Sequence, residues 1–424
     1  MSIIVSTMAK FEIKGGKSLK GEVKVSGSKN AALPILCASL LTKGKTTLKN
    51  VPDIADIHSL IEILNSLGAK AVFKNSTVEI DAKNLKKYQP ASKYVKQMRA
   101  SILLAGPLLA RLNQIKMAFP GGCVLGKRSV HAHTYALTEL GCKVLDDKSG
   151  LHIKTKRLIG KKIILPELSV TATENAIMAA TLASGKTEIR LAAAEPHVQD
   201  LCHFLKTMGA KIFGIGTNTI QIEGVKELKG TTYKITGDYL EAGTLAIAAA
   251  ATKGTVKITN INPDHLDSVW QKLHEMGVKV KLFNNSVQIK PAQSLKPVEM
   301  LKTAVFPGFP TDLQAPFAVL LTQANGVSRI FETLFDGRLN YLFELEKMGA
   351  KVEIINQHQA LIIGPTQLKG IPISSCDIRA GAAMVIAALI AEGETEISNI
   401  NYIDRGYENL HIKLNKLGAS IKRV

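Results

Sequence analysis

Apolar and polar positions recur along this chain in a fixed order, which is marked by one short phrase. The phrase places an apolar residue and a glycine before a small residue and a polar residue, and its glycines are 68 to 73 residues apart. Self-similarity at a fixed period indicates an internal repeat. The six copies are Leu67-Gly68-Ala69-Lys70, Leu140-Gly141-Cys142-Lys143, Met208-Gly209-Ala210-Lys211, Met276-Gly277-Val278-Lys279, Met348-Gly349-Ala350-Lys351 and Leu417-Gly418-Ala419-Ser420.

The neighbours of the phrase predict the same elements in every copy. Before it comes an amphipathic stretch such as residues 57–64, where apolar residues return at helical spacing. The glycine should end that helix, in a position where φ can be positive. After the phrase, two short runs such as 71–73 and 78–80 flank a turn-forming Asn-Ser pair, which predicts a β-hairpin.

A second helix, apolar on most faces, lies further upstream in the repeat and runs toward a glycine and a strand. A helix that is apolar all round is buried, so these segments should form the cores. The repeat unit is therefore helix, strand, helix and hairpin, which makes the fold α/β. The clearest copies are residues 31–41, 174–184, 241–253 and 379–392.

The two ends of the chain predict how the repeats divide into domains. The last repeat stops at 420–424 and lacks the closing pattern of the others, whereas residues 11–21 carry that pattern. The N-terminal strands should therefore complete the sixth repeat. Three repeats per domain then give a first domain of residues 29–236 and a second domain of residues 1–28 with 237–424, with crossings near Ser28 and Gly237.

Composition and charge narrow the class of partner. Hydrophobic residues make up 46% and charged residues 21% of the chain, as in ordinary globular proteins. The net charge of +19 favours anionic partners: nucleic acid, a membrane surface or phosphorylated small molecules. The lysines are dispersed and a single Trp offers little base stacking, so we expect small anions rather than nucleic acid.

The cysteines and the apolar runs favour a cytoplasmic protein. The five cysteines are odd in number and have no CxxC spacing, which argues against a disulfide framework or a zinc site. The N-terminus lacks the architecture of a signal peptide. The longest apolar runs, such as residues 382–391, are too short to span a bilayer.

One loop, residues 119–128, concentrates the features of a reactive thiol. Two glycines precede Cys123 and a third follows it, which suits a tight backbone that approaches a ligand. The adjacent Lys127 and Arg128 should lower the pKa of the thiol and favour the thiolate. Cys123 is therefore a candidate nucleophile or acid, although a loop cysteine without a role fits the same pattern.

Cations and carboxylates also recur at the starts of helices. A helix N-terminus with a Lys or Arg at hand forms a good phosphate or carboxylate site. Solvated charges and a simple N-cap at Asp312 are the alternative interpretations. The positions are Lys29-Asn30, Arg99, Asp312, Asp377 with Arg379, and Asp404-Arg405.

These motifs make the chain resemble the enolpyruvyl transferase family over essentially its full length. Within the family, which includes 5-enolpyruvylshikimate-3-phosphate synthases, the Pro-Gly-Gly-Cys loop is similar to that of the UDP-N-acetylglucosamine 1-carboxyvinyltransferases. The matching motifs are Ser28-Lys29-Asn30-Ala31-Ala32-Leu33-Pro34, Met98-Arg99-Ala100-Ser101, Pro120-Gly121-Gly122-Cys123, Phe309-Pro310-Thr311-Asp312, Asp377-Ile378-Arg379-Ala380 and Ile403-Asp404-Arg405-Gly406-Tyr407-Glu408.

The resemblance implies two inside-out α/β barrel domains, each of three repeats around buried helices. It also implies that the enolpyruvyl group of phosphoenolpyruvate moves to the 3-hydroxyl of UDP-N-acetylglucosamine while phosphate leaves. This is the first committed step of peptidoglycan precursor synthesis. No metal or cofactor is implied, and we expect a monomer that binds neither membrane nor nucleic acid.

The same resemblance implies roles for single residues. Cys123 protonates the methylene carbon of phosphoenolpyruvate, can form a covalent adduct and is the target of fosfomycin. Asp312 accepts the hydroxyl proton, and Asp377 orients Lys29. The phosphoenolpyruvate site comprises Lys29, Asn30, Arg128, Arg379 and Arg405, while Arg99 and Arg338 help to close the domains. The expected contacts of the UDP-sugar are Asn30, Arg99, Ser129, Val130, His131, Ser169, Val170, Asp312 and Leu334.

The departures from the family pattern lie on the side of the acceptor. Where the family has Pro-Val-Asp-Leu after Arg128, this chain has Ser129-Val130-His131-Ala132, and Glu167 stands where a Lys is common. Two alternatives therefore stay open. One is an enolpyruvyl transferase with another nucleotide or sugar acceptor. The other is a non-catalytic, nucleic-acid-binding or regulatory relative, since RNA 3′-phosphate cyclases share related repeats.

Overall fold

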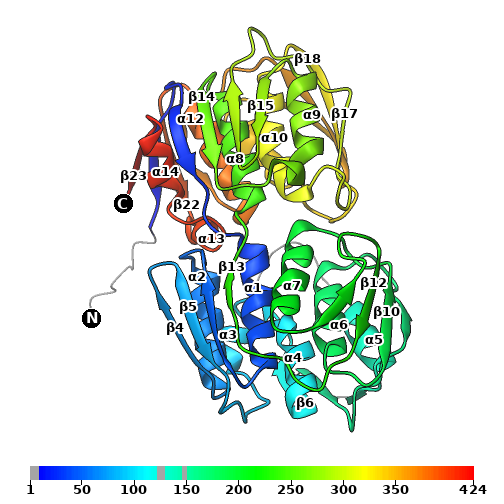
Figure 1. Ribbon diagram of the computed structural model, residues 1–424. Coiled ribbons are helices and arrows are strands. Elements are labelled where there is room, and N and C mark those ends of the chain that lie inside the picture. The colour runs from blue at the N-terminus through cyan, green and yellow to red at the C-terminus, as the bar shows by residue number, and fades with distance from the viewer. Residues whose placement is uncertain (1–8, 122–128, 146–149) are drawn as a thin grey trace, which may run out of the picture. The chain divides into compact units, whose positions relative to one another are not determined.

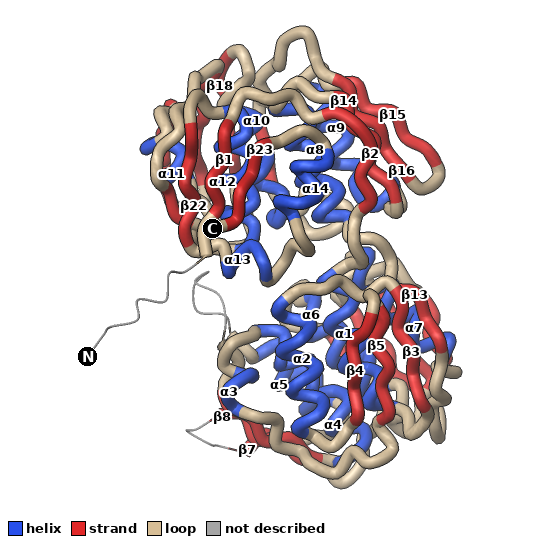
Figure 2. Tube along the Cα trace, turned by 90° about the vertical axis from the view of Figure 1, so that its left-hand side faces the viewer, coloured by secondary structure: helices blue, strands red, loops and turns tan. Residues whose placement is uncertain are grey.

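The structure is a computed structural model that describes residues 9–121, 129–145 and 150–424. In this described part the chain divides into two compact units. The first unit contains residues 27–121, 129–145 and 150–236, and the second contains residues 9–26 and 237–424. Each unit carries three small sheets, with helices in its interior and strands on its outside (Figures 1 and 2).

The sheets of the first unit follow the three repeats in turn. Two of them have four strands and the middle one has three among the described residues. Their strand orders are β13(Thr232–Lys234)-β3(Lys45–Lys49)-β5(Thr77–Asp81)-β4(Lys70–Lys74), then β6(Gln114–Ala118)-β8(Gly150–Lys154)-β7(Lys143–Leu145), and finally β11(Lys211–Phe213)-β12(Thr219–Glu223)-β10(Lys186–Arg190)-β9(Lys162–Ile164).

The helices of the first unit fall into two kinds, as the sequence predicts. The apolar helices α1(Lys29–Ala38), α4(Ala105–Leu112) and α6(Val170–Ala180) are largely buried, and α4 packs against α6. The amphipathic helices α2, α5 and α7 bury one face each. Their bounds, with those of the short helices, are α2(Ala55–Ser66), α5(His131–Glu139), α7(Pro196–Thr207), α3(Ser92–Val95), η1(Ser39–Leu41) and η2(Arg99–Leu104).

The second unit repeats this plan with three four-stranded sheets among the described residues. Each of these sheets places an antiparallel strand pair beside an inner strand, and a parallel strand lies on the outer side of that inner strand. Their orders are β15(Lys279–Phe283)-β16(Ser286–Lys290)-β14(Thr255–Thr259)-β2(Lys20–Lys24), then β17(Met300–Lys302)-β18(Gly326–Phe331)-β20(Gln359–Gly364)-β19(Lys351–Asn356), and finally β21(Ile373–Ser374)-β22(Glu394–Ser398)-β1(Phe11–Lys14)-β23(Ser420–Arg423). In the first two sheets the antiparallel pair is a hairpin, whereas in the third it joins β1 to β23 from opposite ends of the chain.

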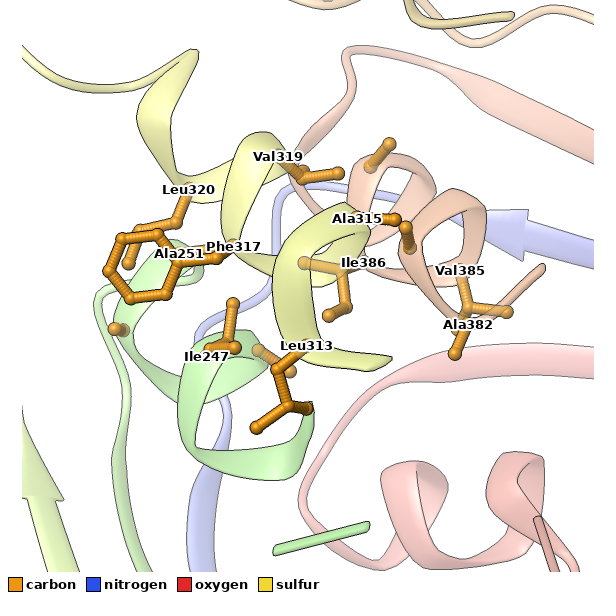
Figure 3. Close-up of a cluster of buried hydrophobic side chains, with 14 of the residues drawn as sticks. Ile247, Ala251, Leu313, Ala315, Phe317, Val319, Leu320, Ala382, Val385 and Ile386 are labelled. Atoms are coloured by element: carbon orange, nitrogen blue, oxygen red, sulfur yellow. The ribbon is translucent and has the colours of Figure 1, made fainter. Parts of the chain in front are cut away.

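Three apolar helices, α8(Tyr239–Ala251), α10(Gln314–Leu321) and α12(Ile378–Ile390), form the core of the second unit. Every residue of α8 and of α10 is buried, and the three helices contact one another. Figure 3 shows Ile247 of α8, Phe317 of α10 and Ile386 of α12 in this cluster. The remaining helices are α9(Asp267–Glu275), α11(Leu342–Lys347), α13(Asn401–Asp404), α14(Leu410–Lys416), η3(Pro263–Leu266) and η4(Thr311–Leu313).

The N-terminal strands separate, and only one of them completes the sixth repeat. Strand β1 lies between β22 and β23 of that repeat and pairs antiparallel with both (Figure 2). Strand β2 instead pairs parallel with β14 of the fourth repeat, so the expectation that both strands complete the sixth repeat is wrong for β2. In the first unit, β13 of the third repeat likewise pairs parallel with a strand of another repeat, β3 of the first. Both pairs are parallel, so neither could be formed by a hairpin between neighbouring strands of the chain.

The glycine of the repeat phrase has the predicted conformation in all six copies. The φ angles run from +88° at Gly277 to +102° at Gly209. This left-handed region costs a residue with a Cβ atom, and glycine enters it freely. The hairpin turn after the first copy also matches, because Asn75 and Ser76 have φ of +49° and +53°. No helix in the described part of the chain is long and apolar enough to cross a membrane.

Candidate active site

In the first unit, the start of α1 brings a buried cation to a carboxylate. Ser28 caps the helix, since its hydroxyl accepts a hydrogen bond from the backbone N–H of Ala31 at 3.3 Å. Lys29 Nζ then lies 2.8 Å from Asp56 Oδ2, and both side chains are buried. Asn30, the next predicted site residue, is partly exposed on the first turn of the helix. Sequence reasoning missed Asp56, an acidic residue in the first turn of α2.

The segment 129–131, which was predicted to contact the acceptor, is held from two sides. Arg99 Nη2 donates to the carbonyl oxygen of Ser129 at 2.8 Å. The Ser129 hydroxyl accepts from the backbone N–H of His131 at 2.9 Å, at the start of α5. The His131 side chain is exposed, 6.2 Å from the ring centre of Tyr135. The structure thus brings Arg99 together with residues 129–131.

Ser169 and Val170, the other predicted acceptor residues of this unit, stand at the start of α6. Ser169 is the N-cap residue, and its carbonyl oxygen accepts from the Thr173 hydroxyl at 2.8 Å. That hydroxyl in turn accepts from the backbone N–H of Ala193 at 3.0 Å. Both predicted residues are partly exposed. Glu167, two residues before the cap, is exposed.

In the second unit, Asp312 lies between two arginines. Arg338 Nη2 is 2.7 Å from Asp312 Oδ1, and Arg379 Nε is 3.0 Å from Asp312 Oδ2. Both arginine side chains are buried, while the carboxylate is 28% exposed. The three residues come from η4, the segment before α11, and α12. The structure therefore joins three predicted site residues that are far apart in the sequence.

These contacts set the ionisation of Asp312. Burial raises the pKa of its carboxyl, but the charges and hydrogen bonds of Arg379 and Arg338 outweigh burial and hold the pKa well below its ordinary value. A carboxylate in this state is ionised and a weak base. The interpretation of Asp312 as a simple N-cap does not hold, because its side-chain oxygens bind guanidinium groups and η4 has no side-chain cap.

The guanidinium of Arg379 also packs against an aromatic ring. Its Nη1 is buried and makes no hydrogen bond within the described residues. The guanidinium carbon lies 5.1 Å from the ring centre of Tyr407. Asp377 caps α12, where its Oδ1 accepts from the backbone N–H of Arg379 at 2.7 Å and of Ala380 at 2.8 Å. Within its own unit, Asp377 therefore fixes the start of the helix that carries Arg379.

Glu332 is a second residue that sequence reasoning missed. It is fully buried, and both of its carboxylate oxygens are used. Oε2 accepts from the Thr311 hydroxyl at 2.8 Å, and Oε1 accepts from the backbone N–H of Leu334 at 2.9 Å. Glu332 thus ties the residue before Asp312 to Leu334, a predicted acceptor residue. The only sign of this role in the sequence is a carboxylate that directly follows strand β18.

Arg405 follows α13 and is partly exposed. The preceding Asp404 is bound by Arg423 of β23 through two hydrogen bonds of 2.8 and 2.6 Å. This bidentate contact holds the turn that contains Arg405 against the C-terminal strand.

Cys123 and Arg128 lie outside the described residues, so their predicted roles stay predictions. Gly121 is the last described residue before them, and a Cβ atom there would lie 1.7 Å from the carbonyl oxygen of Lys96. Only glycine fits there. Among the described residues, no group of three His, Cys, Asp or Glu side chains could hold a metal ion.

The architecture defines the class of protein. The chain matches the enolpyruvyl transferase NikO from Streptomyces tendae with a TM-score of 0.89 and 24% identity, over 98% of this chain and 99% of that one. It matches the EPSP synthase of Acinetobacter baumannii with a TM-score of 0.75 and 20% identity, over 98% and 100%. The fold is that of the enolpyruvyl transferases.

The sequence comparisons then give the family. Residues 13–414 match the family of EPSP synthase (3-phosphoshikimate 1-carboxyvinyltransferase), and the chain belongs to it. Among its relatives is the UDP-N-acetylglucosamine 1-carboxyvinyltransferase of Halothermothrix orenii, which is 44% identical over 98% of this chain and 100% of that protein. The protein of the same name in Borreliella burgdorferi is 40% identical over 98% and 99%.

Proposed function

We propose that this chain transfers the enolpyruvyl group of phosphoenolpyruvate to the 3-hydroxyl of UDP-N-acetylglucosamine and releases phosphate. The observation that carries the proposal is identity of 40–44% along nearly the whole chain to proteins named for this activity. The substrates are small molecules. The protein acts in the cytoplasm as a monomer, without a metal or cofactor.

Cations around the reacting groups suit this reaction. Phosphoenolpyruvate carries a phosphate and a carboxylate, and fixed positive charges stabilise both the substrate and the departing phosphate. Lys29, Arg128, Arg379 and Arg405 are the residues we assign to these anions, and Cys123 supplies the proton to the methylene carbon. The Lys29–Asp56 pair and the Asp377 cap favour this assignment, because each fixes a cation-bearing helix start.

Asp312 accepts the proton of the attacking hydroxyl, and its arginine partners regulate when it can do so. With both guanidinium groups in place the carboxylate is a weak base. An anionic substrate group that approaches Arg379 would partly offset the positive charge that this residue presents to Asp312. Such an offset raises the pKa of Asp312 toward the range in which a general base works.

Phosphate release tests the proposal. The protein is incubated with phosphoenolpyruvate and either UDP-N-acetylglucosamine, another nucleotide sugar or 3-phosphoshikimate, and the product is weighed by mass spectrometry. We expect phosphate and an enolpyruvyl adduct with UDP-N-acetylglucosamine, and neither product from the Cys123→Ala variant. Turnover with a different acceptor, and none with UDP-N-acetylglucosamine, would replace the proposed acceptor.

A further inference from the structure

A buried histidine lies where the acceptor-binding segments of the first unit meet. His133 is on α5, two residues after His131, and only 3% of it is exposed. Its Nε2 is 3.0 Å from the Thr171 hydroxyl on α6, and its Nδ1 is 2.9 Å from Asn175 Nδ2 on the same helix. The mechanism described above uses none of these three side chains.

The amide of Asn175 connects this histidine to the third acceptor segment. Asn175 is fully buried, and its Oδ1 accepts from the backbone N–H of Gly106 at 2.7 Å. Its Nδ2 donates to the carbonyl oxygen of Ile102 at 3.0 Å. Ile102 belongs to η2, the short helix that begins at Arg99. The network therefore reaches α5, α6 and η2, at whose starts all the predicted acceptor contacts of this unit except Asn30 lie.

The hydrogen bonds fix the tautomer of His133. Because Asn175 Oδ1 accepts from Gly106, the amide nitrogen faces His133 and donates to Nδ1. A neutral imidazole has one donor and one acceptor, so Nε2 carries the hydrogen and donates to Thr171. Burial, with the charge of Arg99, lowers the pKa of His133 to about 3. The ring is therefore neutral near pH 7 and does not serve there as a proton shuttle or a pH switch.

We propose that His133 is a positioning residue of the acceptor site, which with Thr171 and Asn175 holds residues 129–131, residues 169–171 and Arg99 in one arrangement. That the acceptor is UDP-N-acetylglucosamine rests on the proposed function. Arg99 binds the Ser129 carbonyl from one side, and His133 fixes the start of α5 from the other. A satisfied buried network of this kind specifies one geometry, since each lost bond leaves a buried polar group without a partner.

Steady-state kinetics on position 133 test the proposal. His133→Phe removes both hydrogen bonds, and His133→Gln restores a donor for Thr171. We expect His133→Phe to raise KM for UDP-N-acetylglucosamine on the order of 10-fold or more, as for a misplaced binding group. KM for phosphoenolpyruvate should stay within about 2-fold of the wild-type value, because on this account the phosphoenolpyruvate site is unchanged. His133→Gln should lie between wild type and His133→Phe.

A matched control and a double-mutant cycle separate positioning from general damage. Thr138 lies on the same helix and is exposed, so Thr138→Val should leave both KM values unchanged. Thr171→Val and His133→Phe should be non-additive in their effect on acceptor affinity. Additive effects, or an equal rise of both KM values in His133→Phe, would overturn the proposal.

Amide hydrogen exchange tests the role of His133 independently of the proposed enzymatic activity. His133→Phe should speed amide exchange in 129–134 and in 169–175 together, and Thr138→Val should not. If the wild-type protein releases no phosphate with UDP-N-acetylglucosamine, the proposed function fails, and exchange alone decides on His133. Faster exchange confined to α5 would show that His133 supports its own helix and does not position the site.

Discussion

At the scale of the residue, the cysteines differ in the chemistry open to them. Burial raises the pKa of the thiol at each of the four described cysteines: that of Cys376 to about 11, those of Cys142 and Cys202 to about 12, and that of Cys37 well above its usual range. The thiolate is the reactive form. These four thiols are therefore poor nucleophiles near pH 7.

We predict that Cys123 is the most reactive thiol and the site of fosfomycin attachment. Its loop has the glycines and neighbouring cations that favour a reactive thiolate, and the other thiols are held protonated. Peptide mass spectrometry after limited fosfomycin treatment should find the adduct on Cys123, and Cys123→Ser should abolish it. Labelling of Cys37 before Cys123 would contradict the prediction.

The altered acceptor residues give a second prediction at this scale. His131 and Glu167 are exposed, near the starts of α5 and α6. A neutral His offers one acceptor nitrogen where an Asp offers two oxygens. A diphosphate bound beside Glu167 would be repelled by its carboxylate. The double variant His131→Asp/Glu167→Lys should bind UDP-N-acetylglucosamine more tightly by about 0.5–1.5 kcal/mol per hydrogen bond gained.

Calorimetry on the wild type, the two single variants and the double variant decides this point, with KM for phosphoenolpyruvate as the unchanged control. Equal affinity of wild type and double variant would place the two residues outside the nucleotide site.

Glu174 gives a pH-dependent prediction. It is 1% exposed, and burial together with the charge of Glu195 raises the pKa of its carboxyl well above the ordinary value. Above pH 4.5 the folded state therefore keeps a proton that the unfolded state loses. The contribution of Glu174 to the free energy of unfolding is fully present below pH 4.5 and falls as the pH rises above that value. Glu174→Gln should remove a slope of up to about 1.4 kcal/mol per pH unit.

Unfolding free energies measured from pH 5 to 8 check this sign. The exposed Glu62 of α2 is the control, and Glu62→Gln should keep the wild-type slope. A Glu174→Gln protein that loses stability with pH as steeply as wild type would show that Glu174 does not carry the effect.

At the scale of the element, the inner strands of the repeats differ at one buried position. Thr46 of β3, Thr187 of β10 and Thr395 of β22 each bury a hydroxyl that has no partner within the described residues, whereas β14 has Val256 at the same place. A buried unsatisfied hydroxyl costs stability, and the isosteric methyl does not. The repeat therefore tolerates Val at this position.

We predict that Thr46→Val or Thr187→Val stabilises the protein by about 1 kcal/mol, because each removes an unsatisfied group. Urea unfolding measures the change. The matched control is Thr303→Val, which should destabilise, because the Thr303 hydroxyl is buried and accepts from the backbone N–H of Thr333 at 2.9 Å. Destabilisation by all three substitutions would mean that the strand hydroxyls have partners.

At the scale of the whole molecule, the N-terminal segment contributes strands to two of the three sheets of the second unit. Strand β1 supplies a middle strand to the sixth-repeat sheet, and β2 supplies the outer strand of the fourth-repeat sheet. We propose that the units correspond to three-repeat domains, 29–236 and 1–28 with 237–424. Each domain would then bury its inner helices on all sides only when all three of its sheets are complete.

Removing β1 should therefore damage residues at the opposite end of the chain. Deletion of residues 1–15 leaves the edges of β22 and β23 without their partner, and we expect faster amide exchange at 394–398 and 420–423. Deletion of residues 1–8, which keeps β1, should leave exchange there unchanged. Faster exchange that spares these strands would show that β1 is dispensable for the sixth repeat.

Features that depend on local geometry and periodicity could be predicted from the amino-acid sequence. The six phrase glycines predicted positive φ, and the hairpin around Asn75 formed where expected, because both follow from steric limits on a few adjacent residues. The apolar helices were recognisable as core for the same local reason. Family resemblance then supplied the expected chemistry.

The pairing of charged side chains could be read only from the folded chain. Asp312 is 26 residues from Arg338 and 67 from Arg379, and His133 is 42 from Asn175. A local pattern marks such residues as polar, but their ionisation and tautomer depend on burial and on partners that only folding supplies. The weak basicity of Asp312 and the fixed ring of His133 are therefore properties of the folded chain.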